Sequence, residues 1–548
     1  MGQIPLLPCS PSLPLASGEL QPALPAQQLT KLPVRYYSFT MKRIFASVTG
    51  LCLLFVFSIT FASCGKKPAA GSSVRSLCMY QIMVSTFKDG DPSIGYTTAW
   101  GPEEETGGDL QGVIDSLDYI RGLGCNAIWL TPVFDSSGAN ADSSSGFEGR
   151  LDSTGYYAKD FFHIDPHFGS DETFRTLVEQ CHKKGLYIFL DGVFGHWGDF
   201  VQPSPSGRLP VRNAGKFTGA AFPQSIEFFK EVAAYWIREY KIDGWRLDQC
   251  YQLGTDGDGI QDGHNYWYDI RLAVEAACAQ NRAEGSAWGT LGYLVGECWK
   301  GSAREIRSSV VDAGTAQGYG LPSCFDFPSR SFVSRILTKP ESSAGKMLAA
   351  VFKTAQEKGY PDFFEPNLFV SNHDVKRLGT EISAAAPAQR PDGADSKTYY
   401  QKHKLAMAIL AAYTGPVTVY YGDEWGAFLA PERIGTFPCY EDNASRTAGK
   451  TGSFSSAEQD VRDYAAALFT ARQKHPALYD GANQTILAEG NVYIGKKTLG
   501  RESIIYLLNC GDEAYAYRLE KGGRNLLTGK RVQKSGSLPP WSALFIEI

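Results

Sequence analysis

Eight short apolar runs, each separated from the next by a longer segment, constrain the fold of this chain most strongly. The runs lie at 78–84, 127–130, 186–190, 242–248, 293–296, 323–327, 368–371 and 417–421. Four of the intervening segments, 109–123, 171–184, 225–241 and 266–280, have the apolar spacing of amphipathic helices. Strands that alternate with helices pair in parallel, and eight such repeats predict an α/β fold built on a (β/α)8 barrel.

The chain before and after these repeats divides into further segments. We expect 1–40 to be a non-native or disordered extension, 41–64 a lipoprotein signal peptide and 65–76 a flexible linker. The barrel then spans 77–476, with a short inserted segment at about 197–222 after the third strand. Residues 477–548 hold short apolar runs between Gly and Asn turns, which predict a C-terminal antiparallel β-sandwich domain without a convincing helix.

The signal segment predicts where the protein is found. Met41-Lys42-Arg43 starts a basic stretch, an apolar run follows, and Ala62-Ser63-Cys64 closes it. Because this pattern resembles a bacterial lipobox, Cys64 is the predicted lipidation site. The protein is then exported and lipid-anchored to a bacterial membrane, in the periplasm or at the cell surface. A plain signal peptide or a signal anchor is the alternative.

Charge and cysteine content argue against several kinds of partner. The 548 residues carry a net charge of −5, and no Lys/Arg cluster stands out in the sequence, which argues against nucleic acid. The nine cysteines after the signal segment are odd in number and contain no CxxC pair. They therefore indicate neither a disulfide framework nor a zinc site.

Polar residues stand at the ends of several predicted strands, which is where barrel enzymes carry their chemistry. At the end of the fourth strand, Arg246 and Asp248 alternate with apolar residues and so share one face. A guanidinium there suggests an ionised Asp248 with a lowered pKa, as a nucleophilic carboxylate needs, and a structural Arg–Asp pair is the alternative. Three other strands end in Asp191 and His196, in Glu297 and Trp299, and in Asn372, His373 and Asp374.

As a set, these strand ends resemble the signature regions of the α-amylase superfamily of retaining glycoside hydrolases. The matching stretches are Asp191-Gly192-Val193-Phe194-Gly195-His196, Gly244-Trp245-Arg246-Leu247-Asp248, Gly296-Glu297-Cys298-Trp299 and Asn372-His373-Asp374. Further patterns of the family are similar to 155–161, 165–169 and 420–424. The four stretches match in order and at barrel-like spacing, so the resemblance is specific and covers nearly everything from Ser76 onward.

The resemblance implies a role for each matching residue. Asp248 would be the nucleophile that forms a glycosyl-enzyme, Glu297 a general acid that is protonated at rest and later a base, and Asp374 a support for the sugar hydroxyls. The expected substrate-binding residues are Tyr156, which would stack on the sugar, and Asp191, His196, Arg246, Trp299, His373 and Arg377. Plain packing is the alternative for Trp299, and neutralisation of the carboxylates is the alternative for Arg377.

Two regions bear on calcium, which members of this family commonly bind. Gly195 stands where the family often has an Asn calcium ligand, which argues against the usual interdomain calcium. Asp89 and Asp91 resemble the calcium loop at the first strand of some members, because clustered oxygens suit Ca2+, and a polar turn is the alternative.

Together these features predict an exported, lipid-anchored enzyme that hydrolyses α-1,4 linkages in starch-derived glucans or maltooligosaccharides. A transglycosylase or isomerase on the same scaffold shares the covalent intermediate and differs in which acceptor reaches it. A non-catalytic glycan-binding protein at the cell surface is a third reading, although the presence of Asp248, Glu297 and Asp374 argues against it.

Overall fold

The computed structural model describes residues 74–96, 107–136, 153–198, 200–212, 219–250, 260–261, 264–312, 318–339, 343–434 and 445–548. All described residues belong to one compact unit, Ser63–Ile548. The predicted extension, signal peptide and lipidation site at Cys64 lie outside the described residues. Within the described part, no helix is long and apolar enough to cross a membrane.

Eight parallel strand segments form a closed ring at the centre of this unit. Six strands make one sheet in the order β10 (Val417–Tyr420), β1 (Cys78–Ile82), β2 (Ala127–Leu130), β5 (Tyr187–Gly192), β6 (Gly244–Leu247) and β9 (Tyr293–Gly296). Parallel bridges from Gly296 to Cys324, from Phe325 to Asn367 and from Leu368 to Val417 join β9 back to β10. The (β/α)8 prediction is confirmed.

The last strands to close the ring are shorter than the sequence predicts. The runs 323–327 and 368–371 contribute bridges only at 324–325 and 367–368. Pro322, Pro328 and Pro366 flank these bridges, and proline cannot donate a backbone hydrogen bond to a strand ladder. The first strand is also shorter than expected, because it ends at Ile82 and Val84 already begins helix α1 (Val84–Phe87).

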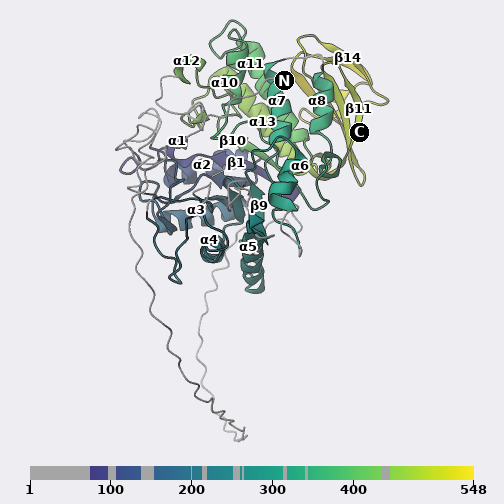
Figure 1. Ribbon diagram of the computed structural model, residues 1–548. Coiled ribbons are helices and arrows are strands. Elements are labelled where there is room, and N and C mark those ends of the chain that lie inside the picture. The colour runs from purple at the N-terminus through teal and green to yellow at the C-terminus, as the bar shows by residue number, and fades with distance from the viewer. Residues whose placement is uncertain are drawn as a thin grey trace, which may run out of the picture. The chain divides into compact units, whose positions relative to one another are not determined.

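Helices surround the ring and follow the strands in chain order (Figure 1). The four predicted helices are present as α2 (Leu110–Gly122), α3 (Asp171–Lys184), α4 (Ile226–Glu239) and α5 (Tyr266–Ala283). The others are α6 (Ala303–Ile306), the π-helical turn η4 (Arg307–Val311), α7 (Phe327–Thr338), α8 (Ala344–Val351), α9 (Ala355–Lys358), α10 (Leu378–Ala385), α11 (Ser396–Ala412), α12 (Pro431–Ile434) and α13 (Ser456–Lys474). Short strand pairs β3 (Phe134–Asp135) with β4 (Asp160–Ile164), and β7 (Ile260–Gln261) with β8 (His264–Asn265), lie in the loops, and the 3-10 turn η1 (Val74–Ser76) precedes β1.

Side chains alternate between two hydrophobic cores along each barrel strand. On β1, Met79 packs inside the ring with Trp129 and Phe189, whereas Tyr80 and Ile82 belong to the larger core between the ring and its helices. This alternation follows from the two-residue period of a strand. The same alternation means that inward-pointing side chains near the C-terminal ends of the strands lie at the rim of the barrel, where the predicted strand-end residues are found.

The C-terminal part is a β-sandwich that packs on the barrel (Figure 1). One sheet has the order β11 (Ala482–Glu489), β12 (Val492–Leu499), β13 (Glu502–Asn509), β18 (Ser542–Glu547), β15 (Gly523–Asn525) and β16 (Arg531–Val532), and the other pairs β14 (Tyr515–Arg518) with β17 (Ser535–Leu538). Tyr493 and Tyr506 face the barrel and pack on Phe352, with ring centroids 5.1 and 5.3 Å away. One helical turn, α14 (Ala477–Asp480), begins this region, where the sequence predicts no helix. All eight cysteines in the described residues are free and buried.

A buried lysine lies where the sandwich meets the barrel. Lys497 on β12 has no exposed surface, and its Nζ donates to Oγ1 of Thr414. Burial, together with the nearby cations Arg472, Lys358 and Arg75, holds the pKa of Lys497 well below its usual value. At neutral pH the unfolded chain therefore binds more protons here than the folded chain, so the free energy of unfolding rises with pH.

We expect Lys497→Met to stabilise the protein, because the wild-type lysine must give up its proton and its hydration on folding, and no carboxylate partner lies beside it among the described residues. The melting temperature should rise by roughly a few degrees near pH 7. As the pH rises from about 7 to 10, the free energy of unfolding should increase less for the variant than for the wild type, because the variant lacks the titrating amine. Thermal unfolding across this pH range tests both statements. The half-buried neighbour Lys496→Met is the matched control, and a lower melting temperature for Lys497→Met would contradict the expectation.

Candidate active site

One fully buried guanidinium, that of Arg246, gathers four carboxylates at the rim of the barrel. Its Nη1 donates to Oδ1 of Asp191 at 2.6 Å and to Oδ1 of Asp248 at 2.8 Å. Its Nη2 lies 3.0 Å from Oε2 of Glu297 and 3.8 Å from Oδ2 of Asp374. The structure therefore brings together all three residues predicted to be catalytic.

The register of the parallel strands explains this convergence. Asp191 on β5 pairs with Arg246 on β6, and Leu247 pairs with Gly296 on β9, so Asp248 and Glu297 follow neighbouring strands at the same level. Beneath the guanidinium, the ring of Trp129 lies 5.3 Å from the Arg246 Cζ atom. Such cation–π contact replaces part of the lost hydration of a buried arginine.

Glu297 is held by donors on both of its oxygens. The backbone N–H of Gln249 donates to Oε2 at 3.0 Å, and the indole Nε1 of Trp299 donates to Oε1 at 2.7 Å. The Glu297 carboxyl group is therefore held in one orientation.

A chain of hydrogen bonds orients His373 toward the same cluster. Gln81, at the end of β1, donates from Nε2 to Nδ1 of His373 at 2.7 Å, which leaves the ring proton on Nε2. This Nε2 lies 3.1 Å from Oδ2 of Asp374 and within hydrogen-bond reach of the Tyr156 hydroxyl. The Tyr156 hydroxyl also donates to Oδ2 of Asp191 at 2.9 Å, and its ring stacks on His373.

Burial decides the pKa values of the carboxyl groups. It raises the pKa of Asp248 well above its usual value, although Arg246 opposes the shift. It likewise raises the pKa of Asp191 to about 7 and raises that of Asp374. The prediction that Arg246 keeps the pKa of Asp248 low is therefore wrong in direction. One cation is shared among four carboxylates, and desolvation of these carboxylates outweighs it.

The two histidines of the site are neutral at ordinary pH. Burial lowers the pKa of His196 to about 4, and burial together with Arg246 and Arg446 lowers that of His373 well below its usual value. His196 lies with Nδ1 3.8 Å from Oδ2 of Asp248. Neutral imidazoles here can exchange hydrogen bonds with hydroxyl groups without adding charge to the site.

Trp299 is the exposed aromatic side chain at the cluster. Its side chain is 41% exposed although its indole N–H is bound to Glu297, and its ring packs on Phe327 at 4.7 Å. The ring thus presents an apolar surface beside the carboxylates while its polar atom stays bound. This arrangement suits a platform for a sugar ring.

Arg377 is the predicted site residue that the structure places elsewhere. Its buried guanidinium donates from Nη1 to the carbonyl of Tyr421 at 2.7 Å and from Nε to Oγ1 of Thr447 at 2.8 Å. This placement argues against both roles expected for Arg377. Arg446, which sequence reasoning missed, lies with Nη2 3.6 Å from Oδ1 of Asp374 and donates from Nε to the carbonyl of His373.

In the loop predicted to hold calcium, Asp91 and the neighbouring Asp109 accept hydrogen bonds from the loop itself. Oδ1 of Asp91 accepts from the N–H and the hydroxyl of Ser93, while Asp109 accepts from the N–H groups of Gly90 and Asp91. Within the described ranges, no group of three or more His, Cys, Asp or Glu side chains could hold a metal ion. The prediction that Asp89 and Asp91 hold calcium is not tested by these contacts and stays a prediction.

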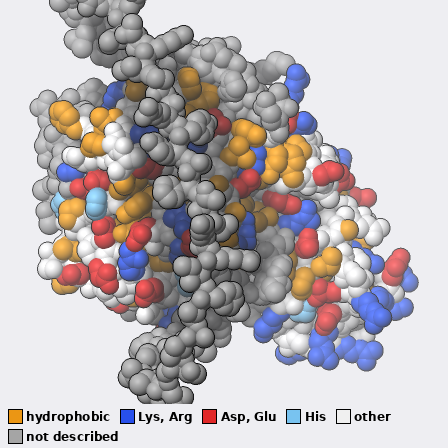
Figure 2. All heavy atoms as spheres, turned by 90° about the horizontal axis from the view of Figure 1, so that it is seen from below, with side chains coloured by type: hydrophobic (Ala, Val, Ile, Leu, Met, Phe, Trp, Pro, Cys, Tyr) orange, Lys and Arg blue, Asp and Glu red, His pale blue; other side chains and the backbone are white. Residues whose placement is uncertain are grey.

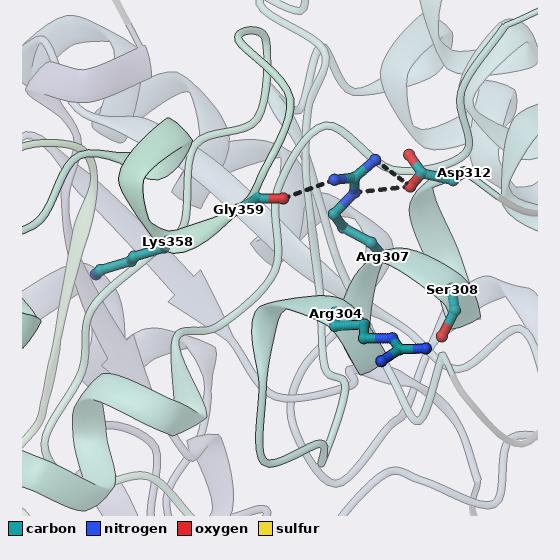
Figure 3. A pocket seen from close by; sticks show the side chains of 6 residues that line it. All are labelled: Arg304, Arg307, Ser308, Asp312, Lys358 and Gly359. Carbon is teal, nitrogen blue, oxygen red and sulfur yellow. Dashed lines mark hydrogen bonds and ion pairs between the residues drawn. The ribbon is translucent and has the colours of Figure 1, made fainter.

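A separate cleft of about 380 Å³ lies outside the carboxylate cluster (Figure 3). It is lined by Arg304, Arg307, Ser308, Asp312, Lys358 and Gly359. Arg307 is bound to Asp312 at 2.6 Å and to the carbonyl of Gly359 at 2.7 Å, and the Lys358 ammonium is bound to Asp326. None of the four clustered carboxylates lines the cleft.

The comparisons with known proteins agree with this geometry. A sequence model of the alpha amylase catalytic domain matches residues 81–205 and 223–480. A cyclomaltodextrinase of Geobacillus thermopakistaniensis is 27% identical over 518 residues, which cover 85% of this chain and 76% of that protein. An intracellular maltogenic amylase of Bacillus subtilis is 29% identical over 387 residues, covering 64% of this chain and 56% of that protein.

A solved structure is also similar over most of its length. A glutamate-to-glutamine variant of AmyP in complex with maltotriose shares 36% identity and has a TM-score of 0.76, covering 87% of this chain and 97% of that one. AmyP in complex with maltose gives 35% identity and a TM-score of 0.75. The predicted family resemblance is confirmed, since the model of the catalytic domain spans well over half of the chain: this protein belongs to the α-amylase family of glycosidases.

Proposed function

We propose that this enzyme hydrolyses α-1,4-linked glucans and maltooligosaccharides with retention of anomeric configuration. The observation that carries the proposal is the placement of Asp248 and Glu297 on the two Nη atoms of one guanidinium. Retaining glycosidases need two carboxyl groups roughly 5–5.5 Å apart, and neighbouring strands that share a cation hold them side by side. The relatives named for cyclomaltodextrin and maltose chemistry, and the maltose complex of AmyP, support the substrate class.

In the first step Asp248 attacks the anomeric carbon of the sugar. Its Oδ1 is held by Arg246, whereas Oδ2 has no hydrogen-bond partner among the described residues and is available to form the bond. Glu297 donates its proton to the glycosidic oxygen as the carbon–oxygen bond breaks. The products of this step are a free glucan end and a glycosyl ester on Asp248.

In the second step water replaces Asp248 at the same carbon. Glu297, now ionised, takes a proton from the water as its oxygen attacks, and the ester bond to Asp248 breaks. The carboxylate of Asp248 and the protonated Glu297 are thereby restored. Two inversions at one carbon leave the configuration retained.

The surrounding residues hold the sugar rather than react with it. Asp374 is 23% exposed, so its carboxylate can reach sugar hydroxyls, and the Nε2 proton of His373 points to the same place. Trp299 offers its exposed ring to a neighbouring sugar. Tyr156 and Asp191 link to Arg246 and keep the guanidinium fixed while charge moves between the carboxyl groups.

We expect maltoheptaose to yield short maltooligosaccharides whose newly formed reducing ends are first released as the α-anomer. Proton NMR within the first minutes distinguishes this outcome from inversion, and chromatography of the products over time shows the cutting pattern. Products longer than the substrate, or rearranged disaccharides, would instead assign the enzyme as a transglycosylase or isomerase. Binding without any product would favour a glycan-binding protein.

Glu297→Gln should lower kcat by about 10³-fold or more, because the amide cannot donate the proton that the leaving oxygen needs. Maltotriose binding, measured by calorimetry, should change by less than about threefold, since the side chain keeps its shape. The isosteric Glu179→Gln, at an exposed position on α3, is the control and should leave kcat unchanged. Full activity in Glu297→Gln would overturn the assignment.

The acid side of the pH profile should reflect the buried carboxyl groups. Asp248 must be ionised to attack, and burial raises its pKa. As the pH is lowered, kcat/KM should therefore begin to fall at a pH that is still above the usual Asp pKa of about 3.9. His196 has a pKa of about 4 and is already neutral there. His196→Gln should therefore lower the rate without moving the midpoint, and a clear shift of that midpoint would show that His196 titrates in the profile.

A further inference from the structure

Six cations lie on one short segment of the C-terminal sandwich, here named the basic ribbon, so the expectation that no Lys/Arg cluster stands out in the sequence is wrong for this segment. It covers residues 518–534 and carries Arg518, Lys521, Arg524, Lys530, Arg531 and Lys534, with Glu520 as its one acidic residue. The ribbon thus has a net charge of +5. Because the whole chain has a net charge of −5, the remainder carries −10.

Strand pairing places these cations side by side. Arg518 on β14 pairs with Ser535 on β17, the N–H of Leu519 donates to the carbonyl of Lys534, and Arg524 on β15 stands directly opposite Arg531 on β16. The N–H of Asn525 then donates to the carbonyl of Lys530. The two halves of the ribbon thus lie side by side and both carry cations, although the pairs β14–β17 and β15–β16 belong to different sheets. In Figure 2, Lys and Arg side chains gather at the lower right, over the C-terminal domain.

Among the described residues, no carboxylate forms an ion pair with the cations of the ribbon. All six side chains are exposed. Glu547 on β18 stands opposite Arg524 in the register but forms no such pair. Like charges on directly opposed strand residues, such as Arg524 and Arg531, are unfavourable, so this arrangement costs stability that an external anion would recover.

We propose that the basic ribbon is a docking surface for the anionic head groups of a phospholipid membrane. Several exposed lysines and arginines on one surface attract the negative potential of such a membrane, and their contributions add. The two aromatic residues next to the ribbon, Tyr515 and Tyr517, pack toward the sandwich core, so they provide no platform on which nucleic-acid bases could stack. A surface that offers charge alone suits a diffuse layer of lipid phosphates.

Docking through the ribbon does not depend on the proposed glucan chemistry, and it does not require the predicted lipid at Cys64. A single acyl chain holds a protein on a membrane only marginally, and a basic surface is the usual second contribution. A protein that carried both the lipid and the basic ribbon would stay on the membrane, whereas a protein with only one of them would dissociate and rebind.

The test uses the compact unit Ser63–Ile548 with Cys64→Ser, so that no lipid can contribute. Sedimentation with vesicles of phosphatidylcholine alone is compared with vesicles that contain about 30% phosphatidylglycerol, at low and high salt. The ribbon variant is Arg524→Gln, Lys530→Gln, Arg531→Gln and Lys534→Gln. The control removes four exposed lysines elsewhere, as Lys183→Gln, Lys346→Gln, Lys397→Gln and Lys474→Gln, with the same change in charge.

The wild type and the control should bind the anionic vesicles, lose binding at high salt and ignore the neutral vesicles. The ribbon variant should bind at least about tenfold more weakly, and its thermal unfolding should show that it is folded. Equal loss in the ribbon variant and the control would overturn the proposal in favour of net charge alone. Binding of neutral vesicles, or tighter binding to a soluble polyanion such as duplex DNA than to the anionic vesicles, would also overturn it.

Discussion

The contact of Arg246 with four carboxylates is the interaction on which the rest of the site depends. A fully buried guanidinium has lost its hydration, and that loss costs several kcal/mol unless charged partners replace the water. Here Asp191, Asp248 and Glu297 lie within 3.0 Å of it. The carboxylates in turn need the cation, because close negative charges repel one another. Each partner makes the burial of the others possible, and the cluster therefore holds its geometry before any substrate arrives.

The barrel strands hold Arg246 and its carboxylate partners in a fixed arrangement. Asp191, Arg246 and Glu297 come from three neighbouring strands whose register is fixed by strand pairing, and inward residues such as Trp129 and Phe189 pack directly beneath the site. Rigid strands position side chains more accurately than loops do. Asp248 and Glu297 must play different chemical roles, and their immediate hydrogen-bond partners make them different. Asp248 keeps one oxygen without a hydrogen bond, whereas both oxygens of Glu297 accept one.

The sequence predicts the barrel and the three carboxyl residues well, because each signal depends on residues close in the chain. Alternation within a strand places Arg246 beside Asp248, and the ends of parallel strands must meet. The misses come from contacts between distant segments. Arg377 follows Asp374 by three positions yet turns toward Tyr421, and Arg446 reaches Asp374 from a loop 72 residues further along the chain. Likewise, Arg246 next to Asp248 in the sequence suggests a low pKa for Asp248. The fold brings three further carboxyl groups to the same place and excludes water, and the pKa of Asp248 is raised instead.

The polar atoms that the protein leaves unsatisfied indicate how the site would respond to substrate. Buried polar groups without partners are uncommon in folded proteins, yet Oδ2 of Asp248 and the Nε and Nη2 atoms of Arg246 have no hydrogen bond within the described residues. Other buried atoms without a partner among the described residues lie elsewhere, for example on His403, Asp423 and Arg472, but the three on Asp248 and Arg246 lie beside the reacting carboxyl groups. A site that keeps its charges fixed and partly unpaired interacts more strongly with a transition state that develops positive charge at the sugar ring than with a neutral sugar. The incomplete pairing of Asp248 is thus consistent with a cluster that is organised for the reacting sugar, because pairing Oδ2 with a protein donor would withdraw the electrons that must form the new bond.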